Sequence, residues 1–412
     1  MLVKAVNRWL WTDADMRVRR VLFALSNLFS DEQVIGGAEL GMLVVMRALR
    51  TIGVEPYVVM HGYGHFGELL RREGIQFEIV PLSQTVTKLS RNRPVVWQCV
   101  PICLEIARLA TAVRRVARHW EIDILHVHHH YGYVACGLAA QGMGIPCIWH
   151  LHEGWERSAI TKVLEISGRV LADYVITIAP YEQSTVASLT DRVPHTLIES
   201  AFDFNELHRS RNRSRHEVRA EFGIGPAEVL IGYVSHLAPY KGQRTFVRAL
   251  NRLASGGSVF FKAIIVGGPR KSFEWFQKDL QLEVNELGLS GQILFCGTRL
   301  DIANVMDAID IFACVSSAEE FNRVLIEAMC FGKPVIASDL RGGSIVAETG
   351  RTGLLVPPDD DQSLAAALKI LLDDLEARVR LGVNGQNYVY QRFSIESLVS
   401  KYERVYDLLL AQ

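Results

Sequence analysis

Short apolar runs alternate with longer amphipathic patterns along the chain, and this alternation predicts repeated strand and helix units. In the first half, the runs that read as strands are residues 18–25, 56–60, 77–81, 122–127, 147–151 and 174–178. Each run is bounded by polar residues, glycine or proline, and an amphipathic helix is expected over residues 40–49. Continuously apolar strands joined through helices are typical of a parallel sheet covered by helices on both faces.

The same rhythm restarts in the second half, where strands are expected at residues 229–234, 260–266, 292–295, 311–315, 334–337 and 354–356. The segment 206–219 between the halves is polar and carries five arginines, which predicts a linker. We therefore predict an α/β protein with two Rossmann-like domains, residues 1–205 and 220–394. A helix at 395–412 is expected to pack back on the first domain. Ligands of such sheets bind beyond the carboxyl ends of the strands.

Composition supports this organisation and excludes some partners. The chain has 412 residues, of which 49% are hydrophobic and 22% charged, as in globular proteins of two domains. A net charge of −1 gives no general attraction to nucleic acid. The seven cysteines form no CxxC pair, so a reducing compartment is expected. No apolar stretch reaches the roughly 18 residues of a membrane-spanning helix, and we predict a cytoplasmic protein.

One stretch, SAEEFNRVLIEAMCFGKPVIASD, combines a polar entry with an amphipathic helix. Phe321 and Asn322 stand at the start of that helix, and its apolar face follows at helical spacing. The first turn of a helix has backbone N–H groups without intrahelical partners, and the helix dipole favours anions there. The stretch therefore predicts an anion site, which would suit the diphosphate of a donor substrate, on the backbone N–H groups of Asn322, Arg323 and Val324.

Two glutamates flank the start of this helix. Glu319 lies before it, and Glu327 lies eight positions later, in its second turn. A carboxylate in that second turn can accept hydrogen bonds from two adjacent hydroxyls of a ribose. Taken alone, the pair is better explained as two surface glutamates beside a core helix. The neighbouring sequence has to decide between the two interpretations.

That neighbouring sequence resembles a known family of enzymes. From Ser317 onward, the two glutamates and the segments AMCFGKPVIASD and RGGSIVAETGRTGLLVPPDD resemble the signature of retaining glycosyltransferases of family 4. VSHLAPYKG, IIVGG, FCGTRLDIANVMDAIDIF and IGGAE resemble further motifs of the family, in the family's order. The resemblance implies the GT-B architecture, in which two Rossmann-like domains with parallel sheets face each other across a cleft. The first domain would bind the acceptor and the second the nucleotide-sugar donor.

The resemblance also implies roles for single residues. Glu319 would contact hydroxyls of the transferred sugar, and Glu327 would contact the ribose. Lys241 would neutralise the leaving diphosphate and so lower the barrier as charge develops. The backbone N–H groups of Gly36 and Gly37, in the IGGAE segment, would complete the contacts to the donor.

The implied reaction is transfer of a hexose from a UDP- or GDP-sugar to a hydroxyl of a sugar, a lipid-linked molecule or a small molecule. Retention would follow from front-face attack, with a leaving phosphate oxygen taking the acceptor proton. The resemblance implies that no metal and no cofactor are needed. Consistent with that, the acidic pairs Asp13 with Asp15 and residues 359–361 lie away from strand ends. Two alternatives on the same scaffold are a nucleotide-sugar hydrolase or epimerase and a non-catalytic nucleotide-sugar-binding subunit.

Two positions depart from the family pattern. The phosphate-binding arginine of the family is replaced by His236, five residues before Lys241. A histidine titrates near neutral pH and lacks the two-pronged guanidinium, so weaker phosphate binding is expected. Glu320 stands where the family commonly has glycine, and it adds charge and bulk beside the sugar site.

Six histidines follow two neighbouring predicted strands: His126, His128, His129, His130, His150 and His152. A metal site is disfavoured, because no carboxylate or cysteine stands at ligand spacing in the first run and consecutive side chains point in different directions. WHLHEG instead resembles the strand of the family that ends in a histidine at the acceptor face. We assign His152 to that position as a catalytic residue, with His150 as its rival.

Residues 104–120 (LEIARLATAVRRVARHW) predict an amphipathic helix whose polar side carries Arg108, Arg114, Arg115 and Arg118. Such a helix can lie on an anionic membrane surface. It can also be an ordinary surface helix with a solvated charged face, which is the favoured explanation. For a lipid acceptor, this helix would make a peripheral contact with the inner face of the membrane.

Overall fold

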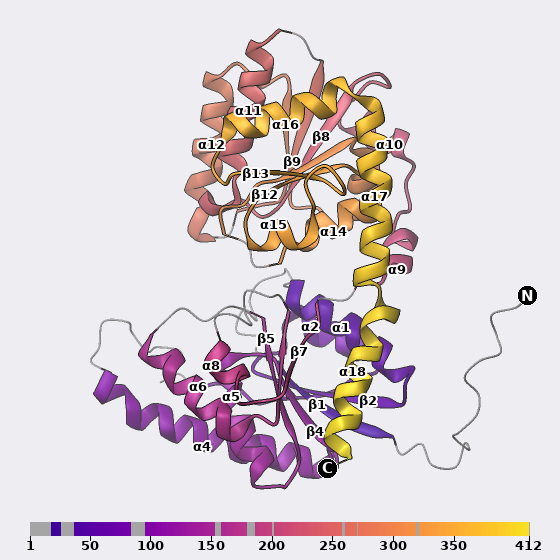
Figure 1. Cartoon of the computed structure of the whole chain (residues 1–412). Helices are drawn as coiled ribbons and strands as arrows, with labels where there is room; N and C mark the ends of the chain where they lie inside the picture. Colours follow the sequence, from indigo (N-terminus) through magenta and orange to yellow (C-terminus); the bar gives the residue numbers. More distant parts are fainter. Residues whose placement is uncertain are drawn as a thin grey trace, which may run out of the picture. The chain divides into compact units, whose positions relative to one another are not determined.

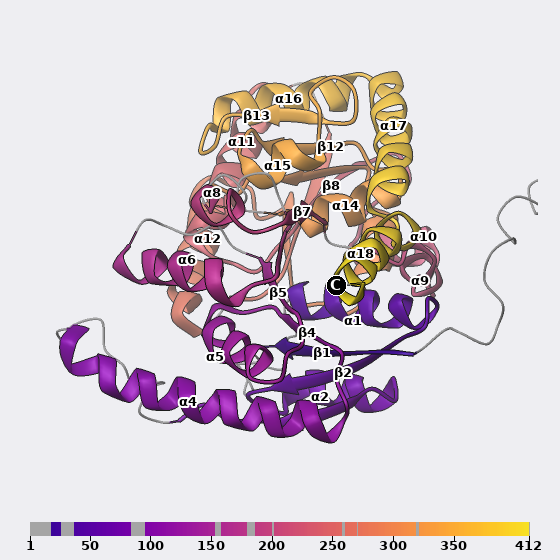
Figure 2. The same cartoon turned by 60° about the horizontal axis from the view of Figure 1, so that its bottom comes forward.

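A computed structural model of the chain describes residues 18–25, 37–83, 95–152, 158–178, 186–199, 202–257, 260–269, 271–318 and 321–411. The chain divides into two compact units. Unit 1 comprises Met1–Ala201 and Leu398–Gln412, and unit 2 comprises Phe202–Ser397. Figures 1 and 2 show the helices and strands of both units from two directions. Within the described residues, no helix is long and apolar enough to cross a membrane.

Unit 1 is built on a parallel sheet with the order β3-β2-β1-β4-β5-β6-β7 among its described residues. The strands are β1 (Arg19–Leu25), β2 (Val54–Met60), β3 (Gln76–Ile79), β4 (Ile124–Val127), β5 (Cys147–Leu151), β6 (Tyr174–Thr177) and β7 (His195–Leu197). The helices of its first segment are α1 (Gly37–Arg50), α2 (Gly64–Arg72), α4 (Val95–His119), α5 (His130–Gln141), α6 (Ala159–Leu171) and α8 (Ala187–Thr190). Strand β7 was not predicted, because its three residues are only partly buried and form no apolar run.

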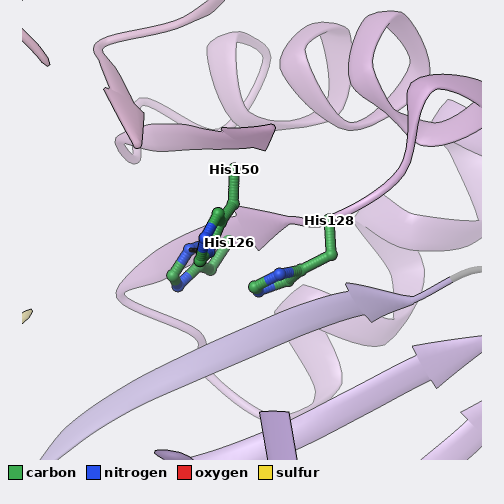
Figure 3. A group of neighbouring side chains, drawn as sticks. All are labelled: His126, His128 and His150. Carbon is green, nitrogen blue, oxygen red and sulfur yellow. Dashed lines mark hydrogen bonds between the residues drawn. The ribbon is translucent and has the colours of Figure 1, made fainter. Parts of the chain in front are cut away.

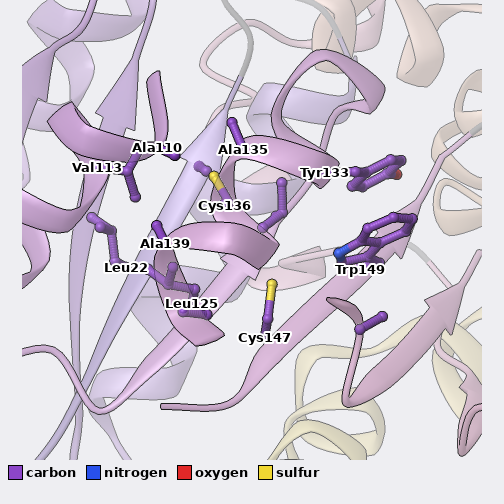
Figure 4. Packing of buried hydrophobic residues seen from close by; sticks show 14 of the residues in the cluster. Leu22, Ala110, Val113, Leu125, Tyr133, Ala135, Cys136, Ala139, Cys147 and Trp149 are labelled. Carbon is purple, nitrogen blue, oxygen red and sulfur yellow. The ribbon is translucent and has the colours of Figure 1, made fainter. Parts of the chain in front are cut away.

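The core of unit 1 lies between this sheet and the helices α4 and α5 (Figure 4). Leu22 and Leu125 from adjacent strands pack with Val113 of α4 and Ala139 of α5. The indole of Trp149 stacks on the ring of Tyr133, with ring centroids 4.7 Å apart. Buried cysteines belong to the same cluster, and burial raises the pKa of the Cys136 thiol to about 12. This thiol therefore acts as a small apolar side chain.

Unit 2 contains a second parallel sheet with the order β10-β9-β8-β11-β12-β13 among its described residues. Its strands are β8 (Val229–Val234), β9 (Phe261–Val266), β10 (Ile293–Gly297), β11 (Ile311–Cys314), β12 (Val335–Ser338) and β13 (Leu354–Val356). The helices after β8 are α11 (Gln243–Ser255), α12 (Glu274–Glu286), α13 (Ile302–Ala308), α14 (Arg323–Cys330), α15 (Arg341–Val346), α16 (Asp361–Asp373) and α17 (Leu375–Phe393). The prediction of two Rossmann-like domains with parallel sheets is confirmed.

The polar segment 206–219 is not a bare linker. It overlaps the helices α9 (Phe204–Arg209) and α10 (Arg215–Glu221), both of which belong to unit 2. Arg219 is buried, and its guanidinium donates to the carboxylate of Asp310 at 2.9 Å. Asp310 lies 91 residues further along the chain than Arg219, so the sequence of the segment by itself gave no sign of this pair.

The last helix, α18 (Ile395–Leu410), has most of its length in unit 1. Within the described residues, two ion pairs join it to that unit. Asp407 pairs with Arg19 of β1 at 2.7 Å, and Lys401 pairs with Glu199 at 3.1 Å. Tyr402 and Tyr406 of α18 are buried, so this helix covers part of the sheet of unit 1.

Candidate functional site

In each sheet, the strand order reverses next to the first strand of the unit. In unit 2 the reversal lies between β8 and β11, which pair in parallel. Ligands of open α/β sheets bind at such a switch point, outside the carboxyl ends of the strands. The loops that leave these two strands lead to Lys241 on one side and to α14 on the other. The loop that carries Lys241 and the segment that enters α14 therefore both start from the carboxyl edge of the same sheet.

The loop after β8 carries Lys241 in a single 3-10 turn, η1 (Pro239–Lys241). The hydroxyl of Tyr233, at the end of β8, donates to the carbonyl oxygen of Lys241. The same hydroxyl accepts a hydrogen bond of 3.0 Å from the backbone N–H of Val315. The buried phenol of Tyr233 thus holds η1, called the lysine turn below, against Val315 at the end of β11. Nothing in the sequence pattern distinguished Tyr233 from other apolar strand residues.

Gly242, directly after Lys241, explains why the two loops can come so close. Its φ is +76°, in the left-handed region that favours glycine. A Cβ atom at this position would lie 2.1 Å from the carbonyl oxygen of Val315. Only a residue without a side chain fits there.

A backbone contact joins the lysine turn to the segment that enters α14. The N–H of Ser317 donates to the carbonyl oxygen of Tyr240 at 2.9 Å. Tyr240 precedes Lys241, and Ser317 lies five residues before Asn322. The structure therefore brings Lys241 and the start of α14 to neighbouring loops, as an anion site at this position requires.

The start of α14 is fixed by Asn322. Its side-chain oxygen accepts from the N–H of Leu325 at 3.4 Å, and its side-chain amide donates to the Cys314 sulfur at 3.2 Å. The amide is therefore occupied as a helix cap. Phe321 is also structural, since it is buried and packs edge-on against Phe393.

Arg323 and Glu327 lie one turn apart on α14, and both are half-buried, as is Val324 between them. The guanidinium of Arg323 lies 4.1 Å above the ring of Phe202. Burial lowers the pKa of Arg323, and the charge of Glu327 opposes that shift. Burial raises the pKa of Glu327, and Arg323 opposes it in turn. The Nη1 atom of Arg323 is buried without a hydrogen-bond partner among the described residues.

His236 lies in the same loop as Lys241. Its Nε2 atom is 3.1 Å from the hydroxyl of Tyr240, and its carbonyl oxygen accepts from the side-chain amide of Gln243 at 2.9 Å. The histidine that replaces the family's arginine is thus held in place by its own loop.

Four predicted site residues remain to be placed: Gly36, Gly37, Glu319 and His152. Gly36, Glu319 and the neighbouring Glu320 lie outside the described residues. Gly37 is the first residue of α1, in unit 1. His152 follows β5, also in unit 1. Their predicted roles stay predictions.

Unit 1 presents a cluster of four histidines, His126, His128, His150 and His152, beside its own switch point between β1 and β4. Strands β4 and β5 pair in parallel with His126 opposite Ile148. Alternate side chains share one face of a sheet, so residues 126, 128, 150 and 152 all face the same way. Figure 3 shows the rings of His126, His128 and His150 gathered on one side of these strands.

Two close nitrogen pairs connect the four rings. The Nε2 atom of His126 lies 3.2 Å from Nδ1 of His150, and Nδ1 of His128 lies 2.9 Å from Nε2 of His152. The Nε2 atoms of His128 and His150 are buried and have no hydrogen-bond partner among the described residues. A buried polar atom without a partner costs about 1–3 kcal/mol.

Burial keeps all four histidines neutral at physiological pH. It lowers the pKa of His126 to about 3 and that of His152 to about 4. The pKa values of His128 and His150 also fall well below 6.5, first through burial and then through the neighbouring imidazoles. A histidine that exchanges protons near pH 7 is therefore not available in this cluster.

The expectation that consecutive histidine side chains diverge leaves out the alternate residues His126 and His128. It considered consecutive residues only, whereas the strand period is two. The sequence also gave no sign of Tyr406, whose hydroxyl lies 3.0 Å from Nδ1 of His126. The pattern His-x-His occurs at the end of both strands, and it could have indicated that each strand places two histidines on one face. Whether the two pairs meet depends on the pairing register of the strands, which the sequence does not show.

Comparison with known proteins assigns the chain to a family. Residues 35–203 match the model of Glycosyltransferase Family 4, and residues 228–374 match that of Glycosyl transferases group 1. This chain belongs to the family 4 glycosyltransferases. The two matches fall in unit 1 and unit 2, with only residues 202 and 203 of the first crossing the boundary between the units.

Named relatives support this glycosyltransferase assignment. N-acetyl-alpha-D-glucosaminyl L-malate synthase of Bacillus anthracis is 28% identical over 305 residues, which cover 72% of this chain and 78% of that protein. D-inositol 3-phosphate glycosyltransferase of Nocardia farcinica is 35% identical over 184 residues, 43% of this chain and 40% of that protein.

Solved structures show the same fold. Anabaena HepE, crystallised in complex with UDP, has a TM-score of 0.78 at 24% identity and covers 95% of this chain and 100% of that one. A glycosyltransferase of Rickettsia africae has a TM-score of 0.79 at 19% identity, covering 95% and 98%. The chain is a glycosyltransferase with the GT-B fold, a fold that binds nucleotide sugars.

Proposed function

We propose that this glycosyltransferase moves a hexose from a UDP- or GDP-sugar to an acceptor hydroxyl, with retention of configuration and without a divalent metal at the diphosphate. The observation that carries the proposal is the junction of Lys241 with the entry to α14 at the switch point of unit 2. The N–H of Ser317 and the carbonyl of Tyr240, 2.9 Å apart, make that junction. The junction places the ammonium of Lys241 beside the first backbone N–H groups of α14. Both kinds of group bind anions, so the arrangement suits a diphosphate.

In the proposed donor complex, the diphosphate accepts hydrogen bonds from the first N–H groups of α14 and faces the ammonium of Lys241. The buried Nη1 of Arg323, which has no hydrogen-bond partner among the described residues, offers a further donor. Glu327 accepts from the ribose hydroxyls, and the neighbouring guanidinium favours its charged form. Glu319 contacts the transferred sugar.

The proposed chemistry needs no covalent intermediate on the protein. The bond between the anomeric carbon and the diphosphate oxygen breaks, and the acceptor oxygen bonds to the same face of that carbon. The acceptor proton passes to the leaving phosphate oxygen. Lys241 stabilises the charge that develops on the diphosphate. Gly36 and Gly37 contact the donor from unit 1, and His152 contacts the reacting sugar or the acceptor hydroxyl.

Donor and acceptor candidates follow from the relatives. HepE was crystallised with UDP and with UDP-glucose, which supports UDP-sugars as the first donors to test. The names of two relatives, an L-malate synthase and a D-inositol 3-phosphate glycosyltransferase, point to small acidic acceptors. A third relative is a lipopolysaccharide core mannosyltransferase of Rhizobium meliloti, which adds lipid-linked sugars to the acceptor panel.

The deciding experiment measures release of UDP or GDP from a panel of nucleotide sugars, with and without these acceptors and with EDTA present. Acceptor-dependent release that persists in EDTA, with an α-linked product from an α-linked donor by NMR, supports the proposal. Release without an acceptor would indicate a hydrolase. Donor binding without any release would indicate a non-catalytic subunit, an alternative that His236 favours.

We also propose that α4 makes the membrane contact if the acceptor is a lipid. The structure changes which residues should be tested. Arg115 pairs with Glu78 at 3.1 Å, and Arg114 donates to the carbonyl of Leu138 at 3.1 Å, so both arginines serve unit 1 itself. Arg118 is exposed, and Leu104 is 67% exposed on the same helix.

The membrane experiment is co-sedimentation with vesicles of phosphatidylcholine alone or with added phosphatidylglycerol. Leu104→Glu and Arg118→Glu should reduce binding to the anionic vesicles. Exposed Arg209 of unit 2 provides the matched control, Arg209→Glu, which should bind as wild type does. Equal binding by all variants would remove α4 from the membrane contact.

A further inference from the structure

The histidine cluster of unit 1 brings the ring nitrogens of three buried histidines close together, besides placing His152 at the end of β5. His126 lies inside β4 and is fully buried, and His150 lies inside β5. One ring nitrogen from each of His126, His128 and His150 lies within 4.8 Å of the other two. The imidazoles of His126, His128 and His150 lie close together near the carboxyl ends of β4 and β5. The proposed sugar transfer assigns no role to this group of three.

We propose that His126, His128 and His150 bind one transition-metal ion, of the class of Zn²⁺, as a structural site of unit 1. Imidazole nitrogens suit Zn²⁺, Cu²⁺ and Ni²⁺, and a water molecule beside three histidine ligands would complete the four-coordinate geometry of a zinc site. The inference does not depend on the proposed transfer reaction, because the ion would lie in unit 1 and not at the donor diphosphate.

The spacing of the nitrogens fits such an ion. In a tetrahedral zinc site with Zn–N bonds of about 2.0–2.1 Å, two ligand nitrogens lie roughly 3.3 Å apart. The Nε2 of His126 and the Nδ1 of His150 are already 3.2 Å apart. The third nitrogen, within 4.8 Å, has to approach by about 1.5 Å at most. The His128 ring has to supply that shift, and it lies beside the rings of His126 and His150 (Figure 3).

The surroundings of the cluster resemble those of bound metals. A histidine that ligates a metal usually gives its other N–H to an oxygen acceptor, which fixes the ring. The Nδ1 of His126 lies 3.0 Å from the hydroxyl of Tyr406 in α18, which can accept that hydrogen. The buried Nε2 atom of His128, without a partner among the described residues, is available to the ion.

The structural consequence is a link between three elements. The ion would join β4 to β5 and, through His126 and Tyr406, would join both strands to α18. Because the ligands converge only in the folded chain, binding should stabilise unit 1 by mass action. His152, 2.9 Å from His128, would be oriented by the same assembly.

The experiment uses the full-length protein, stripped with a chelator and then titrated with ZnCl₂ or CoCl₂. We expect one equivalent of metal by elemental analysis, a visible spectrum of Co²⁺ with nitrogen ligands in a four- or five-coordinate site, and a higher Tm with Zn²⁺. His150→Gln should lose the Co²⁺ spectrum, and Tyr406→Phe should weaken metal binding about 10-fold. His65→Asn, at an exposed histidine of unit 1, should bind as wild type.

Two results would overturn the inference. One is a stripped wild-type protein that shows neither the Co²⁺ spectrum nor a shift in Tm. The other is loss of the same metal signal in His65→Asn but not in His150→Gln, which would place the ion elsewhere. Because a His150 variant can fail to fold, the wild-type titration and the Tyr406→Phe affinity are read independently of it. UDP binding measured in parallel keeps this test separate from the proposed function.

Discussion

The Nδ1 atom of His126 in β4 lies 3.0 Å from the hydroxyl of Tyr406 in α18, although 280 residues separate the two in the chain. This contact ties the last helix of the protein to a central strand of unit 1. Since both residues are buried, the hydrogen bond forms away from water. Removing either partner therefore leaves the other as a buried polar group without a hydrogen bond.

Tyr406→Phe should therefore destabilise the metal-free protein by about 1 kcal/mol, because it removes one buried hydrogen bond and leaves Nδ1 of His126 unpaired. Urea denaturation followed by circular dichroism measures the change. Tyr402→Phe is the matched control, since the Tyr402 hydroxyl makes no hydrogen bond within the described residues. Equal effects of the two substitutions would contradict the role of the Tyr406 hydroxyl.

Acid should destabilise the protein over a window set by the histidine cluster. The folded pKa of His126 is about 3 and that of His152 about 4, whereas an unfolded histidine has a pKa near 6.5. The unfolded state thus binds more protons below pH 6.5, and stability falls as pH falls. The loss by pH 5 is about 2 kcal/mol for each histidine that stays neutral.

Urea midpoints at pH 7.5, 6.0 and 5.0 measure this slope. Carboxylates act in a lower window. Hydrogen bonding to Arg108 holds the pKa of Glu105 at about 2, so its contribution is lost only below about pH 4.5. The groups that face the cluster from α18, Tyr402 and Tyr406, have pKa values raised by burial and stay neutral throughout. His65→Asn should leave the slope unchanged, and a flat profile from pH 7.5 to 5.0 would contradict the prediction.

Gly242→Ala should both destabilise unit 2 and weaken donor binding. The new Cβ would lie 2.1 Å from the carbonyl oxygen of Val315, so the lysine turn has to move away from β11. We expect a loss of roughly 2–4 kcal/mol in unfolding free energy, from backbone strain and the clash together. Gly257→Ala is the control, because Gly257 has a similar φ of +71° but no atom of the described residues within 4 Å of its Cβ position. It should cost only about 1 kcal/mol.

Glu327→Ala should weaken nucleotide-sugar binding by about 10- to 100-fold, the range of one or two charge-assisted hydrogen bonds to the ribose. Glu319→Ala should instead lower kcat with a smaller effect on donor affinity. Calorimetry with the nucleotide and initial rates with the full substrate pair separate the two effects. Glu286→Ala, at an exposed residue of α12 in unit 2, is the control. Wild-type donor affinity in Glu327→Ala would remove its assigned role.

Arg219→Met should destabilise unit 2 by about 2–4 kcal/mol, because it leaves buried acceptors without their cation. The side chain is 7% exposed, and it donates to Asp310 at 2.9 Å and to the carbonyl of Glu228 at 2.5 Å. Arg209→Met is the control, since Arg209 is exposed and makes no contact of this kind within the described residues. Thermal unfolding distinguishes the two variants, and similar Tm values for both would show that α10 is only loosely held.

The sequence alone determined most of the strands and the donor segment. A buried parallel strand is a local apolar run, so β1, β5, β8 and β11 could be placed within a few residues. The family motifs around Lys241 and α14 are also local, and their order along the chain was enough to identify the family. The edge strand β7 escaped because its residues are only partly buried.

Only the tertiary structure decided which distant residues meet. The pairing register of β4 and β5 aligned the histidines, and a shift by one residue would have turned one set away. Asp310, the carboxylate partner of Arg219, lies 91 residues downstream, and Tyr406 approaches His126 from the end of the chain. Such contacts depend on both partners and on the packing between them, so neither local sequence carries the information by itself.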